Sequence, residues 1–136
     1  MLTYVKSEVS SAQIIDLHTH LLPSTHGTLH LRGIDDLLTY HYLVAEYFLS
    51  APSSITPEVL YAMTKQEQAM LIWNALFVER NPISEATRGV CTVLQRIGLG
   101  DALRRKDLNE IRKFYNERRS KPEVFEEEIF EKAGIR

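Results

Sequence analysis

Gln13-Ile14-Ile15-Asp16-Leu17-His18-Thr19-His20 is the stretch that decides which fold and chemistry the sequence predicts. Its apolar start predicts a short buried strand over residues 13–18. Because alternate side chains of a strand point to the same side, His18 and His20 are expected to share one face with Asp16. Paired imidazoles suit transition metals, so the pattern predicts a divalent metal site, with zinc as the first choice and manganese as the alternative. Two histidines that only pack or form hydrogen bonds are the simpler interpretation.

The loop after this stretch favours the metal site. Residues 23–28 read Pro-Ser-Thr-His-Gly-Thr, which is polar and turn-prone, and sites in α/β folds lie where strands end in such loops. A metal held there can polarise an oxygen or activate a water. Two ligands do not complete a site, so further ligands are expected from elsewhere.

The rest of the chain predicts helices. Gly33-Ile34-Asp35-Asp36 precedes an apolar pattern with helical spacing that continues to about Leu49. Thr56-Pro57 predicts the start of a short helix, and the capping box Thr64-Lys65-Gln66-Glu67 predicts the start of a longer one. Gly98 predicts the end of the helix after that. A lone strand cannot form a sheet, so the chain is expected to be incomplete without further chain; the alternative is a small helical protein in which the apolar run is no strand.

Composition narrows the classes of partner. The 136 residues are 44% hydrophobic with a net charge of −2, which fits one globular domain and gives no general attraction to nucleic acid or acidic membranes. No apolar stretch approaches the ~20 residues that span a bilayer. The first residues do not have the pattern of a secretory signal, and Cys91 is the one cysteine, so we expect a reducing, cytoplasmic location.

Three landmarks in order resemble a known family. His18-x-His20 after an apolar strand resembles the amidohydrolase superfamily. The segment of residues 33–42, which ends in His41-Tyr42, is similar to a helix of the uronate (glucuronate) isomerase family. Arg80-Asn81-Pro82, followed by Thr87, resembles the family's Arg-Asn-Pro segment. The resemblance covers roughly residues 14–94.

The resemblance implies a fold. It predicts an α/β protein, namely the N-terminal part of a metal-dependent-hydrolase-type (β/α)8 barrel, mostly helical in this stretch with one clear strand. Residues 1–136 would then form a single unit, with residues 13–18 as the first barrel strand and residues 34–133 as a helical insertion and the first helices.

The resemblance also implies a function. It predicts an isomerase that interconverts aldose and ketose forms of hexuronates, as in glucuronate to fructuronate, with an active site that is incomplete within these residues. His18 and His20 would bind the metal, His41 and Tyr42 would be catalytic residues that also contact the sugar, and Arg80 would bind substrate.

Two other functions remain open. One is another hydrolase of the amidohydrolase superfamily, in which the metal activates water, and the other is a non-catalytic helical interaction module. The isomerase prediction implies a small sugar acid as ligand, and either the remainder of a longer chain or another subunit as partner. A homo-oligomer is also left open, whereas nucleic acid and membrane are not expected as partners.

Overall fold

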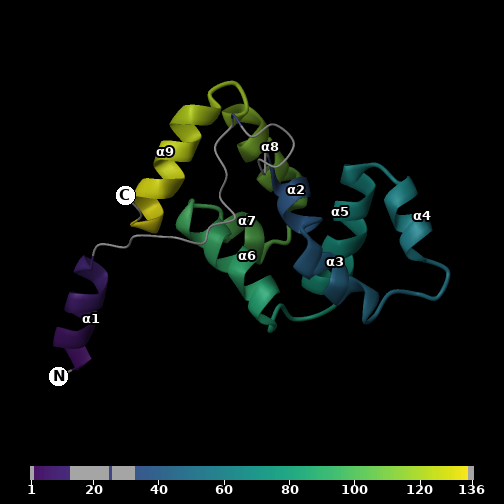
Figure 1. The fold of residues 1–136 in the computed structure, drawn as a ribbon, viewed down its shortest axis with the longest axis horizontal. Helices are drawn as coiled ribbons and strands as arrows, with labels where there is room; N and C mark the ends of the chain where they lie inside the picture. The colour runs from purple at the N-terminus through teal and green to yellow at the C-terminus, as the bar shows by residue number, and fades with distance from the viewer. Residues whose placement is uncertain (1, 13–24, 26–32, 135–136) are drawn as a thin grey trace. The chain divides into compact units, whose positions relative to one another are not determined.

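The structure is a computed structural model that describes residues 2–12, 25 and 33–134. The regular elements of these residues are all helices (Figure 1). In chain order they are α1 (Leu2–Ser11), α2 (Ile34–Leu38), α3 (His41–Phe48), α4 (Pro57–Ala62), α5 (Lys65–Trp73), the π-helix η2 (Asn74–Val78), α6 (Glu85–Arg96), α7 (Gly100–Arg104), α8 (Leu108–Arg118) and α9 (Pro122–Ala133).

The predicted α/β fold class is wrong. The described residues contain helices and no strand, so they show no part of a barrel sheet. The predicted first barrel strand, residues 13–18, lies outside the described residues. The physical reason is that apolar residues of the described part recur at helical spacing, and the helices of residues 31–120 bury apolar side chains against one another.

Contacts divide the chain into two compact units, which are described separately. One comprises residues 1–30 and 121–136, and the other comprises residues 31–120. The predicted domain organisation of residues 1–136 stays a prediction.

The unit of residues 31–120 contains the buried hydrophobic side chains. Helix α2 packs against α5 and α8, and α3 contacts α5 and α6 (Figure 1). Helix α7 lies between α6 and α8 and packs against both of them. The largest fully buried side chains are Trp73, Ile34, Leu38, Leu60, Ile72, Leu94, Ile111 and Thr87. Helix-on-helix packing therefore accounts for this unit.

Local sequence explains where several helices begin and end. Thr56 caps α4 ahead of Pro57, and Thr64 forms the predicted capping box with Glu67 at the start of α5. Gly98 has a φ of 89°, a left-handed conformation that favours glycine, and the chain leaves α6 there. These predicted helix boundaries are confirmed.

Helix α5 continues into a turn of π-helix. The amide of Glu79 donates to the carbonyl of Asn74 at 2.8 Å, which closes the wider turn. Trp73 and Phe77 lie on the buried side of this junction, with ring centroids 4.8 Å apart in a stacked arrangement. The junction thus keeps two large aromatic rings in the core.

The predicted continuous helix from about Leu37 to Leu49 is wrong. The chain leaves α2 at Thr39, and Tyr40 has extended backbone angles, so α3 starts anew at His41. The hydroxyl of Thr39 donates to the carbonyl of Asp35 at 2.8 Å and accepts from Nζ of Lys65 at 2.9 Å. This contact with α5 stabilises the break, although the apolar spacing alone favours a single helix.

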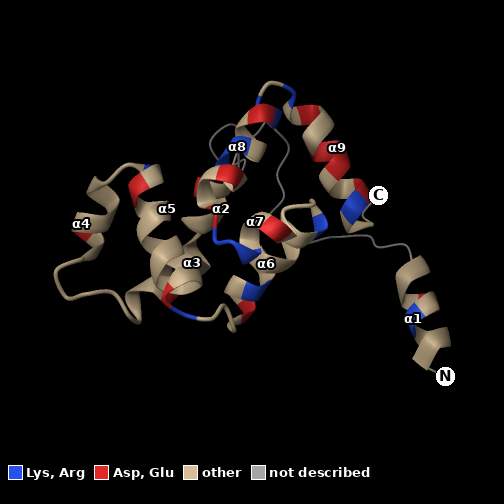
Figure 2. Ribbon diagram, turned by 180° about the vertical axis from the view of Figure 1, so that it is seen from behind, with Lys and Arg blue, Asp and Glu red and all other residues tan. Residues whose placement is uncertain are grey.

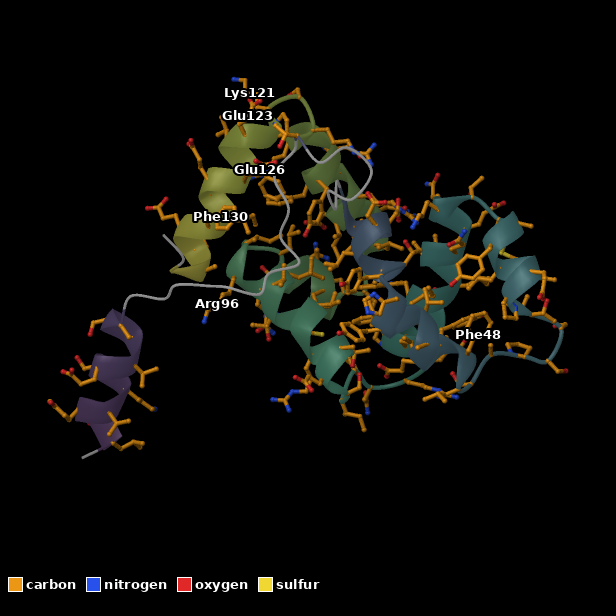
Figure 3. All side chains as sticks on the ribbon, viewed as in Figure 1. Phe48, Arg96, Lys121, Glu123, Glu126 and Phe130 are labelled. Carbon is orange, nitrogen blue, oxygen red and sulfur yellow. The ribbon has the colours of Figure 1, made fainter. Side chains whose placement is uncertain are left out.

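The other unit contributes α1 and α9. All the residues of α1 are exposed, and neither helix has a buried residue. Acidic residues recur along α9 (Figure 2). Glu123 and Glu126 lie in its first half, and Phe130 lies farther along the helix (Figure 3). Across the described ranges, no helix has the length and apolar character that crossing a membrane requires.

Candidate functional site

The predicted metal ligands lie outside the described residues. His18 and His20 belong to residues 13–20, of which the structure gives no account, so their role stays a prediction. Their donor chemistry, two imidazoles separated by one residue, fits zinc or manganese. Within residues 2–12, 25 and 33–134, no group of three or more His, Cys, Asp or Glu side chains could hold a metal ion.

His41 and Tyr42 lie at the start of α3. Their ring centroids are 4.1 Å apart, and the ring of Tyr40 lies 4.3 Å from His41 and 5.5 Å from Tyr42. We call Tyr40, His41 and Tyr42 the aromatic triplet. His41 is exposed, as is Tyr42 with 56% of its surface accessible. The two predicted catalytic side chains are therefore adjacent and accessible to a ligand.

The opposite side of α3 anchors the aromatic triplet. Leu43, Val44 and Tyr47 are buried, and α3 packs through this side against α5 and α6. Burial raises the pKa of Tyr47, and the charge of Glu79 raises it further. Phe48, at the end of α3 (Figure 3), has its ring 5.8 Å from that of Tyr47. A helix fixed in this way presents its first residues at a defined position.

Arg80 lies in the connection between η2 and α6. Its side chain is exposed. Among the described residues, no hydrogen bond, ion pair or ring contact joins it to His41 or Tyr42. The structure therefore does not bring Arg80 into direct contact with the aromatic triplet, and its role in substrate binding stays a prediction.

Glu46 and Ser84, which the sequence did not indicate as site residues, join α3 to the segment between η2 and α6. Ser84 caps α6, and its Oγ donates to Oε2 of Glu46 on α3 at 2.6 Å. A serine followed by a helical pattern is a local sign of a cap, and that sign was available for Ser84. The partnership with Glu46 spans 38 residues, so no local pattern could reveal it.

Comparison with known proteins gives one informative likeness. The chain is similar to the crystal structure of a uronate isomerase from Bacillus halodurans C-125, with a TM-score of 0.83 and 41% sequence identity. The likeness covers 98% of this chain and 30% of that chain, so this sequence spans less than a third of the solved enzyme's length. No family model matches the chain. No curated protein matches it. The predicted resemblance to the uronate isomerase family is confirmed.

Proposed function

We propose that this chain is part of a metal-dependent isomerase that interconverts aldose and ketose forms of hexuronates, of the glucuronate-to-fructuronate type. The observation that carries the proposal is the likeness to the uronate isomerase from Bacillus halodurans C-125, in both structure and sequence. The adjacent, exposed side chains of His41 and Tyr42 supply groups of the kind that such a reaction needs.

The reaction needs no external oxidant. The aldehyde carbon of the sugar acid is reduced to an alcohol while the neighbouring carbinol carbon is oxidised to a ketone. A proton leaves the carbinol carbon and the aldehyde oxygen gains a proton, which gives an enediol. The hydroxyl proton of the former carbinol then leaves, and a proton is added to the former aldehyde carbon. The protein must therefore hold a proton-transferring group close to two adjacent carbons.

The side chains of this chain have distinct roles in the proposal. His41 donates a hydrogen bond to a sugar oxygen or relays a proton, and Tyr42 does the same through its phenol. Arg80, which is exposed, pairs with the carboxylate of the sugar acid, because a guanidinium matches a carboxylate with two parallel hydrogen bonds. His18 and His20 would hold the metal, which supplies Lewis-acid polarisation of the sugar oxygens when it is bound.

The proposal is tested with the protein that contains this chain, loaded with zinc or manganese. We expect the keto acid to form from glucuronate or galacturonate, detected by chromatography. His18→Ala should lower the metal bound per chain by at least about tenfold and the turnover with it, whereas His30→Ala should leave the metal content unchanged. The metal content is measured by elemental analysis.

Different results would support other functions. Turnover of lactones or amides without any isomerisation would contradict the proposal and favour a hydrolase. A protein that neither binds metal nor turns over any of these compounds would contradict both enzymatic functions. The non-catalytic helical interaction module would then be the remaining hypothesis. A metal content that His18→Ala does not change would refute the assignment of His18 as a ligand.

A further inference from the structure

A cluster of three polar side chains connects α3 to the start of α6. Oγ of Ser84 donates to Oε2 of Glu46 at 2.6 Å, and it lies 2.7 Å from Oγ1 of Thr87. The amide of Thr87 donates to the same Oγ of Ser84 at 3.1 Å. Thr87 is 1% exposed, and Glu46 and Ser84 are partly buried. We call Glu46, Ser84 and Thr87 the α3–α6 clasp.

The protons in the α3–α6 clasp can be assigned. Ser84 has one hydroxyl proton, and the carboxylate of Glu46 can only accept, so that proton lies on the short Ser84–Glu46 bond. The hydroxyl of Thr87 must then donate, either to Oγ of Ser84 at 2.7 Å or to the carbonyl of Ser84 at 3.2 Å. Every donor of the clasp is used, and Glu46 is the acceptor on which the arrangement depends.

The clasp holds one end of the segment that carries Arg80. At the other end, Nζ of Lys106 donates to the carbonyl of Val78 at 2.7 Å. The segment of residues 78–84 is therefore fixed on both sides of Arg80. On α3, Glu46 lies one helical turn after Tyr42, so the clasp forms on the same helix that carries the aromatic triplet.

We infer that Glu46 is a positioning residue: through Ser84 it holds the segment of residues 78–84 against α3, and so places Arg80 where it can bind the carboxylate of a sugar acid held at His41 and Tyr42. The substrate role rests on the proposed function. The role of Glu46 in holding the segment is independent of the proposed function, because it depends only on the contacts of residues 78–84.

Limited proteolysis tests the holding of the segment without any turnover. Trypsin cleaves after Arg80, and cleavage after Arg119 at the end of α8 is the internal reference. Glu46→Ala should raise the rate of cleavage after Arg80 roughly tenfold relative to the reference, because the segment opens more often. Glu46→Gln keeps an oxygen that accepts from Ser84, so it should restore the slow rate. Glu127→Ala, the same change at an exposed site on α9 away from both cleavage sites, should leave the rate unchanged.

Kinetics with glucuronate test the substrate role. Glu46→Ala should raise KM roughly tenfold and change kcat less than twofold, because the affected contact binds substrate and takes no part in proton transfer. Glu46→Gln should restore KM. Ser84→Ala removes the same hydrogen bond from the other side and serves if Glu46→Ala does not fold. The double variant should have no larger effect on KM than the stronger single variant.

The outcomes separate this inference from the proposed function. An unchanged rate of cleavage after Arg80 in both Glu46→Ala and Ser84→Ala would overturn the positioning role of Glu46. Faster cleavage with an unchanged KM would overturn its link to the substrate. Absence of turnover in the unaltered protein would overturn the proposed function and the substrate role together, while the cleavage rates still decide whether the clasp holds the segment.

Discussion

Tyr115 shows how burial of one side chain makes stability depend on pH. It lies on α8 with 7% of its surface exposed, and burial raises its pKa from 10.0 to about 12. The folded protein therefore retains the phenol proton at a pH at which the unfolded chain has lost it. The stability that depends on this proton is fully present below about pH 10 and is lost as the pH rises through about 12.

The expected loss can be measured against a variant that lacks the phenol. We expect the free energy of unfolding of the unaltered protein to fall, relative to Tyr115→Phe, by about 2–3 kcal/mol between pH 10 and 12. Urea unfolding at successive pH values measures it. Tyr61→Phe, which removes the phenol of a tyrosine that is 63% exposed, is the control for loss of a phenol at the surface. A flat difference for Tyr115→Phe would show that its phenol titrates normally in the folded protein.

Three helices meet at one ion pair. Nε of Arg112 on α8 donates to Oδ1 of Asp35 on α2 at 2.9 Å, and its Nη2 donates to the carbonyl of Gln66 on α5 at 3.1 Å. The side chains of Arg112 and Asp35 are 9% and 23% exposed. A guanidinium in this position depends on its carboxylate partner, since an unpaired buried charge is costly.

Removal of the carboxylate should therefore destabilise the protein more than removal of the whole pair. We expect Asp35→Ala to lower the free energy of unfolding by about 3 kcal/mol, and Asp35→Ala with Arg112→Met to recover most of that loss. Urea denaturation measures both.

A surface pair provides the control. Asp101→Ala breaks the ion pair between Asp101 and Arg104, two side chains that are each more than two-thirds exposed. It should lower the free energy of unfolding by less than about 1 kcal/mol. If Asp35→Ala cost no more than Asp101→Ala, the pair between α2 and α8 would not contribute to the packing of these helices.

The start of a helix could be predicted from sequence where its cap is local. The hydroxyl of Thr64 accepts from the amide of Glu67, three residues away, so the pattern carries the whole interaction. At the break between α2 and α3, by contrast, Nζ of Lys65 donates to the hydroxyl of Thr39 from 26 residues away. Sequence patterns do not contain such contacts, and the apolar spacing then favours one continuous helix.

The same distinction applies to the candidate site. His41 and Tyr42 are neighbours in sequence, and the structure places their rings together. Glu46 and Ser84 meet only because α3 packs against α6, so neither residue could be assigned a role beforehand. The pair His18 and His20 stays a prediction, because it lies outside the described residues.

At the scale of the whole chain, the fold class was the least predictable feature. The α/β prediction depended on one apolar run, residues 13–18, and on a family resemblance, although a single strand says little about the rest of the chain. The described residues bury their side chains between helices. The resemblance therefore predicted the related protein family correctly, whereas the fold class inferred from it was wrong for the described residues.

The distribution of buried side chains predicts that residues 31–120 fold alone. Every buried hydrophobic residue among the described ones lies between Ile34 and Tyr115, and neither α1 nor α9 has a buried residue. We expect a protein of residues 31–120 to unfold cooperatively in urea, with a free energy of unfolding within about 1 kcal/mol of that of the full chain and a similar m-value. A version that ends at residue 107 should lose the cooperative transition, because it lacks α8 with Leu108, Ile111 and Tyr115. Loss of the transition in residues 31–120 as well would mean that the stability of this unit depends on the residues removed.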